Sequence, residues 1–156
     1  MGRAQSQWRD DAAWVGRLVR DQRLLGERLG QDRLMVLGQV VGILDGAGQI
    51  DFLVVYGRAA REGADVANDV DLYFEAPYLR DQLQREEAEG ATAYHAYGWP
   101  SGRLLLNLRA GLGFSFGLIR DGLIFVDRGP YREILAAIDE ERLALAPGES
   151  PDKPRP

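Results

Sequence analysis

The 156-residue chain has no cysteine, one histidine (His95) and one lysine (Lys153). The absence of cysteine excludes disulfides, thiolate nucleophiles and thiolate zinc sites. No hydrophobic run approaches the roughly 20 residues that span a bilayer. The first 14 residues carry acids where a signal peptide needs an apolar stretch. We therefore expect a cytoplasmic protein that has no membrane partner.

Positive charge is also scarce, with 19 basic against 24 acidic residues and a net charge of −5. Proteins that bind nucleic acids usually present a basic surface that neutralises phosphates, so we do not expect a nucleic-acid partner. The hydrophobic fraction of 46% is ordinary for a folded chain. The length suits a single domain with its own core.

The hydrophobic pattern predicts an α+β domain with a mixed sheet covered by helices. Predicted helices span 8–29, 31–45, 77–89 and 130–145. Predicted strands span 52–56, 70–75, 92–97, 103–108, 113–119 and 123–127, the last two joined by a hairpin turn at Asp121-Gly122.

The same pattern divides the chain into three parts. Residues 1–30 form an N-terminal helical extension, 31–146 form the mixed-sheet domain, and 147–156 form a tail with four prolines. The extension either covers the sheet or packs against a partner, which includes a second copy of the chain.

Two aspartates mark the most informative segment. An apolar strand ends at Gly57, a polar loop follows, and the next strand begins with Asp69-Val70-Asp71. Strand side chains alternate, so Asp69 and Asp71 share a face, about 6.5–7 Å apart along the backbone. Two such carboxylates repel each other unless a cation lies between them, and Mg²⁺ takes one or two carboxylates plus substrate phosphates. The alternative is a solvent-facing strand start without an ion.

The spacing of this segment resembles that of a known family. Gly57-Arg58, ten residues and Asp69-Val70-Asp71 are similar to the Gly-Ser, ten residues, Asp-x-Asp hallmark of the minimal nucleotidyltransferases (MNT) of the DNA polymerase β superfamily. The later run IRDGLIFVDRGPYREIL resembles that family's usual ending, so the resemblance covers about residues 33–140. It implies a nucleotidyltransferase fold and a Mg²⁺-dependent transfer of AMP from ATP to a hydroxyl group.

The resemblance also implies residue roles. A third carboxylate on a neighbouring strand binds the second metal in this family, and Asn107 in the predicted strand 103–108 takes its place here. The implied catalytic residues are Asp69, Asp71 and Asn107, the implied metal ligands are Asp69 and Asp71, and the implied nucleotide-binding residues are Gly57, Arg58 and Asn68.

Two of these residues depart from the family pattern. Arg58 replaces the serine, and it either clamps phosphate or forms a surface ion pair with Glu62 or Asp65. Asn107 brings no charge, so it is either a weak metal ligand or a structural hydrogen-bonding residue.

The segment 92–99 also contains candidate functional residues. We interpret His95 as a strand residue with a satisfied ring rather than a general base. The aromatic residues around it, Tyr94, Tyr97 and Trp99, either stack on a base or pack in the core.

Minimal members of the family often serve as antitoxins that adenylylate an all-helical HEPN ribonuclease toxin. The resemblance therefore implies a nucleoside triphosphate and a HEPN-type toxin as partners. The alternative is a catalytically degenerate domain that binds nucleotide or protein, and Arg58 and Asn107 are the residues that favour it.

Overall fold

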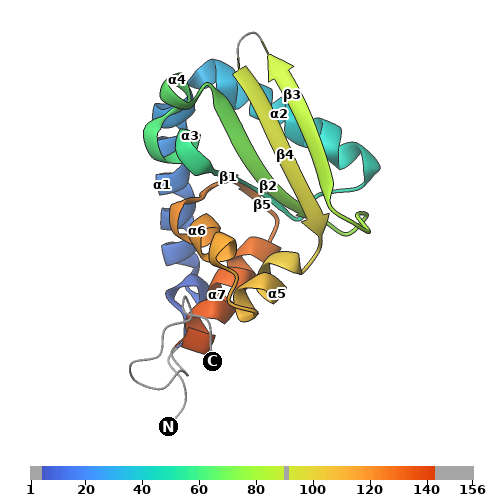
Figure 1. Cartoon of the computed structure of the whole chain (residues 1–156). Coiled ribbons are helices and arrows are strands. Elements are labelled where there is room, and N and C mark those ends of the chain that lie inside the picture. Colours follow the sequence, from blue (N-terminus) through green and yellow to red (C-terminus); the bar gives the residue numbers. More distant parts are fainter. Residues whose placement is uncertain (1–4, 90–91, 143–156) are drawn as a thin grey trace.

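The computed structural model describes residues 5–89 and 92–142 as a five-stranded sheet with helices on both faces (Figure 1). The strands are β1 (Phe52–Tyr56), β2 (Asp69–Ala76), β3 (Leu83–Glu89), β4 (Thr92–Pro100) and β5 (Leu123–Asp127). The helices are η1 (Gln7–Arg9), α1 (Asp11–Leu29), α2 (Gln31–Leu44), η2 (Asp45–Ala47), α3 (Gly57–Glu62), α4 (Ala64–Ala67), α5 (Arg103–Arg109), α6 (Gly113–Asp121) and α7 (Pro130–Arg142). No helix among these residues is both long and apolar enough to cross a membrane.

The sheet is mixed, in the order β3-β4-β2-β1-β5. β1 runs antiparallel to β2 and β5, β3 and β4 form an antiparallel pair, and β2 is parallel to β4. This arrangement confirms the predicted α+β class with a mixed sheet.

Alternation along β2 sends its side chains into two different layers. Val70, Leu72 and Phe74 belong to a cluster that includes Leu25 of α1 and residues of α2. On the other face, Tyr73 belongs to a second cluster with residues of α5, α6 and α7. Asp69 and Asp71 therefore lie on the face that α5–α7 cover in part.

Helix α1 covers one edge of the sheet. The buried Asp21 side chain accepts a hydrogen bond of 2.9 Å from the Ile124 backbone N–H of the edge strand β5 and pairs with Arg17 at 3.1 Å. The Gln22 amide donates to the carbonyls of Ile124 and Phe125. These bonds occupy polar backbone groups that would otherwise be open to pairing with another chain.

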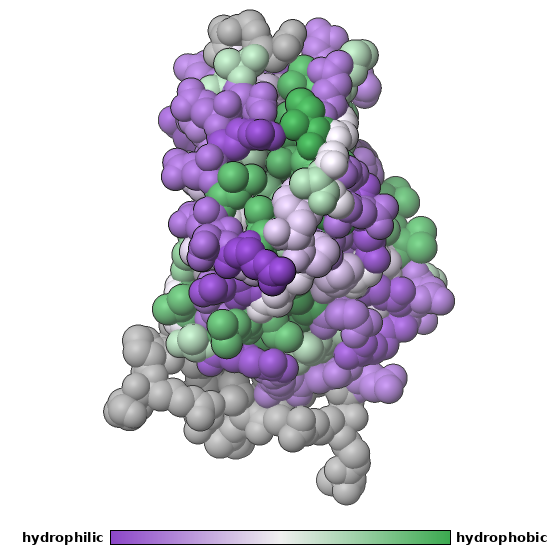
Figure 2. Space-filling view, turned by 90° about the vertical axis from the view of Figure 1, so that its right-hand side faces the viewer, coloured by the Kyte–Doolittle hydropathy of each residue, from purple (hydrophilic) through white to green (hydrophobic). Residues whose placement is uncertain are grey.

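The opposite edge strand, β3, carries charged side chains, including Arg85, Glu86 and Glu87. Figure 2 looks at this side of the molecule and shows hydrophilic side chains over much of it. Charges on an edge strand disfavour edge-to-edge association.

Predicted strands 52–56, 70–75, 92–97 and 123–127 and the first two predicted helices are confirmed, with shifts of a few residues at their ends. The last predicted helix is present as α7, and its predicted end and the tail 147–156 lie outside the described residues. The separation of residues 1–30 as an extension stays a prediction, as does association through this helix. Leu25 and Leu29 of α1 are fully buried, whereas Val15 and Val19 are exposed.

Four other predictions are wrong. Part of the predicted helix 77–89 is strand β3, the predicted strands 103–108 and 113–119 are helices α5 and α6, and no hairpin forms at Asp121-Gly122. Leu83–Glu89 is rich in helix-forming residues, but pairing with β4 overrides that local preference. The short apolar runs at 103–108 and 113–119 fit helix and strand equally well by periodicity. In α5 the apolar residues Leu104 and Leu108, four apart, are both buried.

We predict that Asp21→Ala lowers the free energy of unfolding by about 3–5 kcal/mol, because it leaves the buried Arg17 charge and the Ile124 N–H without their partner. Urea denaturation measures this change. The control is Asp11→Ala, whose 91% exposed side chain pairs with Arg132 and whose loss should cost less than about 1 kcal/mol. Equal effects of the two substitutions would show that α1 does not depend on the buried ion pair.

Candidate functional site

Three potential metal ligands meet where β2 and β4 begin. The parallel register places Asp71 beside His95 and Asp69 beside Ala93. One ligand atom from each of Asp69, Asp71 and His95 lies within 4.8 Å of the others, and Asp69 Oδ2 is 3.7 Å from His95 Nε2. We call these three residues the Asp-Asp-His cluster. The prediction that both aspartates share a face is confirmed.

The electrostatics of the cluster favour a cation. Burial raises the pKa of Asp71 above its usual value, and the neighbouring Asp69 carboxylate raises the pKa further, while His95 has the opposite effect. Asp69 remains half exposed, so the cluster is open to an incoming ligand. Two carboxylates and an imidazole are donors that proteins use for divalent ions. The residues present therefore fit a divalent metal.

Gly57 lies directly beside the cluster. It links β1 to α3 with φ of 76°, and a Cβ built on it would lie 3.0 Å from Asp71 Oδ2. A side chain here would be strained by the backbone and would crowd the carboxylate. The absence of a side chain at Gly57 thus keeps the space next to Asp71 open.

The predicted ten-residue loop is formed largely by the short helices α3 and α4. Asn68 ends α4 in a left-handed conformation with φ of 64° and is exposed next to Asp69. Asparagine tolerates this conformation better than most residues. The chain can therefore enter β2 directly from α4. The nucleotide-binding roles of Gly57 and Asn68 stay predictions.

Arg58 is exposed and forms an ion pair with Glu62 one turn later in α3. This is one of the two alternatives that the sequence left open. An exposed pair of this kind is worth at most about 1 kcal/mol. Phosphate contact by Arg58 stays a prediction, because an ion pair this weak would not hold the arginine away from a phosphate.

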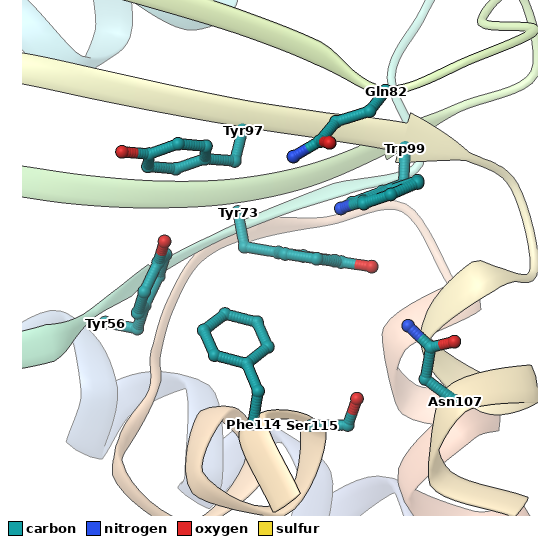
Figure 3. Close-up of a pocket in the computed structure, with 8 residues that line it drawn as sticks. All are labelled: Tyr56, Tyr73, Gln82, Tyr97, Trp99, Asn107, Phe114 and Ser115. Carbon is teal, nitrogen blue, oxygen red and sulfur yellow. The ribbon is translucent and has the colours of Figure 1, made fainter. Parts of the chain in front are cut away.

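Asn107 lies in α5 and not in a strand. The prediction that Asn107 takes the place of the third metal ligand relied on a strand at 103–108. That strand does not exist, so the premise of the prediction is wrong. Its side chain lines a pocket together with Trp99 and Phe114 (Figure 3). On the side of β2 away from β1, the neighbouring strand is β4, and His95 is the residue paired with Asp71 there.

Sequence reasoning missed His95 as a partner of the aspartates because it assigned the neighbouring strand to residues 103–108. The signal that could have found it is alternation within 92–97. His95 shares a face with Tyr97 and Trp99, whereas Tyr94 is buried in the first core cluster on the opposite face. His95 Nε2 lies 3.7 Å from Asp69 Oδ2, and the expectation of a satisfied ring stays a prediction.

A pocket of about 300 Å³ lies next to the cluster on the same face of the sheet. Tyr73 follows Asp71 by two positions in β2, and Tyr97 follows His95 by two positions in β4. The pocket lies between these strands and the helices α5 and α6 (Figure 3). Its lining consists of Tyr56, Tyr73, Gln82, Tyr97, Trp99, Asn107, Phe114 and Ser115.

A similar fold occurs in a solved structure, that of a nucleotidyltransferase-like protein from Exiguobacterium sibiricum. The two superpose with a TM-score of 0.52 at 11% sequence identity, over 74% of this chain and 40% of that one. This chain has a nucleotidyltransferase-like fold. It spans about two fifths of the length of that relative, and at this identity the likeness concerns the fold alone. No protein-family model and no curated protein matches the sequence.

We predict that Asp71→Asn weakens binding of Mn²⁺ by at least about tenfold, because the Asp-Asp-His cluster loses a charged metal ligand. Calorimetric titration with MnCl₂ measures the affinity. Asp65→Asn is the control, because Asp65 is a 90% exposed carboxylate that pairs with Arg33. If both variants bind Mn²⁺ as the wild type does, the cluster does not hold the ion.

Proposed function

We propose that the protein transfers a nucleoside monophosphate, with ATP as the favoured donor, to a hydroxyl group of a protein partner. The observation that carries this proposal is the convergence of Asp69, Asp71 and His95 beside Gly57 within a nucleotidyltransferase-like fold. In the reaction, the acceptor oxygen bonds to the α-phosphorus and the bond to the pyrophosphate oxygen breaks. Pyrophosphate leaves, and the acceptor proton is released to solvent.

Each residue of the site would have its own role in binding. Asp69, Asp71 and His95 would hold a divalent ion, Mg²⁺ by the sequence resemblance. When bound, such an ion supplies positive charge that offsets the charge of the triphosphate and of the leaving pyrophosphate. Gly57 leaves room for phosphate oxygens, and the exposed amide of Asn68 and guanidinium of Arg58 lie within the same loop, where both can donate hydrogen bonds.

The protein acceptor is proposed from the sequence motif. The resemblance to minimal nucleotidyltransferases favours an all-helical HEPN-type ribonuclease as the molecule that is modified. The net charge of −5 supports a protein acceptor over a nucleic acid, since a nucleic-acid backbone would be repelled.

A second candidate is a domain that binds nucleotide or protein without efficient catalysis. His95 favours it, because the residue beside Asp71 on β4 is an imidazole and not a carboxylate, so it adds no negative charge for a second metal. The pairing of Arg58 with Glu62 favours it as well, since the arginine already has a partner.

We predict that the chain incorporates label from α-³²P-ATP into a protein acceptor in the presence of Mg²⁺ or Mn²⁺. Label from γ-³²P-ATP should not be incorporated, because the γ-phosphate leaves in pyrophosphate. The assay uses a purified HEPN-type protein as the acceptor, because the protein kinases of a cell extract would themselves transfer the γ-phosphate. Asp69→Asn/Asp71→Asn should abolish the signal. No incorporation from any of the four labelled nucleoside triphosphates would contradict the enzymatic proposal.

We further predict that His95→Asp raises Mg²⁺-dependent transfer by about tenfold, which corresponds to about 1.4 kcal/mol of transition-state stabilisation, since it adds a third carboxylate at the cluster. The control is Gln39→Asp, which adds the same charge at an exposed position of α2. If neither substitution changes the rate, the site is not a weakened transferase site and the second candidate is favoured.

A further inference from the structure

The pocket beside the Asp-Asp-His cluster has an unusual lining. Five of its eight residues are aromatic and the other three are the neutral polar residues Gln82, Asn107 and Ser115. The volume of about 300 Å³ is at the lower end of the range for small-molecule sites. Because none of the eight side chains is charged at neutral pH, the pocket suits a neutral planar group rather than a phosphate.

The rings are arranged around the opening. Figure 3 shows Tyr97 and Trp99 along β4 and Phe114 and Ser115 on α6, at opposite sides of the pocket. Phe114 contacts Tyr56 edge to face, with 5.5 Å between ring centroids. It is nevertheless 58% exposed, so much of an apolar ring is in water at the rim of the pocket. A stacked planar ligand would cover it.

Two other rings have fixed positions. The Tyr73 hydroxyl donates a hydrogen bond of 2.8 Å to the buried Glu75 carboxylate, which holds the ring as the floor of the pocket. The Arg103 guanidinium lies 4.9 Å from the centroid of the Trp99 ring. These interactions preorganise the pocket, so a ligand need not order these rings.

The pocket begins two residues further along β2 and β4 than the cluster. Asp71 and Tyr73 are two residues apart on the same face of β2, and so are His95 and Tyr97 on β4. This separation is about 6.5–7 Å, which is roughly the room that a ribose takes between a phosphate and a base. A nucleotide whose phosphates lie at the cluster would therefore reach the pocket with its base.

We propose that this pocket binds the adenine base of the donor nucleotide. The base stacks between the Tyr97 and Phe114 sides of the pocket, and the Asn107 amide at one end pairs with its polar edge. Amide side chains pair with N6 and N7 of adenine, whereas arginine and lysine pair with guanine, and neither occurs among the eight lining residues. This inference rests on the proposed function for the position of the phosphates.

The test uses adenosine, which has no phosphate and needs no metal. Calorimetry on the full chain should show binding of adenosine about tenfold tighter than binding of guanosine. Tyr97→Ala should weaken adenosine binding about tenfold, because a stacking ring is lost, while Tyr97→Phe should retain it. Asn107→Ala should remove the preference for adenosine.

Two controls test whether a change in adenosine affinity arises from the pocket and not from the fold or the Asp-Asp-His cluster. Leu106→Ala changes an exposed residue of the same helix, α5, that does not line this pocket, and it should leave adenosine affinity unchanged. Asp69→Asn/Asp71→Asn should retain adenosine binding but lose the metal-dependent part of ATP binding.

The outcomes distinguish the two proposals. Adenosine binding that depends on Tyr97 and Asn107 supports the base pocket, even if no transfer is detected and the proposed function fails. Undetectable adenosine binding, or adenosine and ATP affinities that are the same in Tyr97→Ala and Asn107→Ala as in the wild type, would overturn the base pocket. Metal-dependent transfer could still be present in that case.

Discussion

The parallel pairing of β2 with β4 is the constraint on which the candidate site depends. Its register sets Asp71 beside His95 and Tyr73 beside Tyr97. A slip of one residue would turn the paired side chains of one strand to the opposite face. The register is fixed from that opposite face, where Val70, Leu72 and Phe74 are fully buried against the layer that includes α1 and α2. Hydrophobic burial on one side of the sheet thus determines which polar groups meet on the other side.

Two unfavourable local features lie at the end of the sheet where the cluster is. Asn68, which is not a glycine, has a left-handed backbone, and the pKa of Asp71 is raised by burial and by Asp69. The buried Glu75, by contrast, accepts hydrogen bonds from the Tyr73 hydroxyl and from the N–H groups of Gly102 and Leu104. Glu75 therefore anchors α5, whereas Asp69 and Asp71 remain close together without such a set of donors. This contrast is typical of a site that awaits a ligand.

The sequence allowed prediction of four of the strands from their apolar runs, and of the shared face of Asp69 and Asp71 from the alternation of strand side chains. It did not reveal β3, α5 and α6. The charged residues of Leu83–Glu89 show no alternation, and the run RLLLNL has no decisive period. The error at 103–108 carried over to the site, since Asn107 was placed in a strand and His95 was left without a role. Only the pairing of distant strands, which no single-sequence period encodes, brings His95 to the aspartates and Tyr97 to the pocket.

The most direct test of the account is a crystal structure of the full chain with Mn²⁺ and a non-hydrolysable ATP analogue, in which anomalous scattering locates the ion. The account predicts a peak about 2.0–2.2 Å from oxygens of Asp69 and Asp71 and from His95 Nε2, with the triphosphate beside Gly57. An ion and nucleotide bound elsewhere, or a well-ordered cluster without either at saturating concentrations, would contradict it.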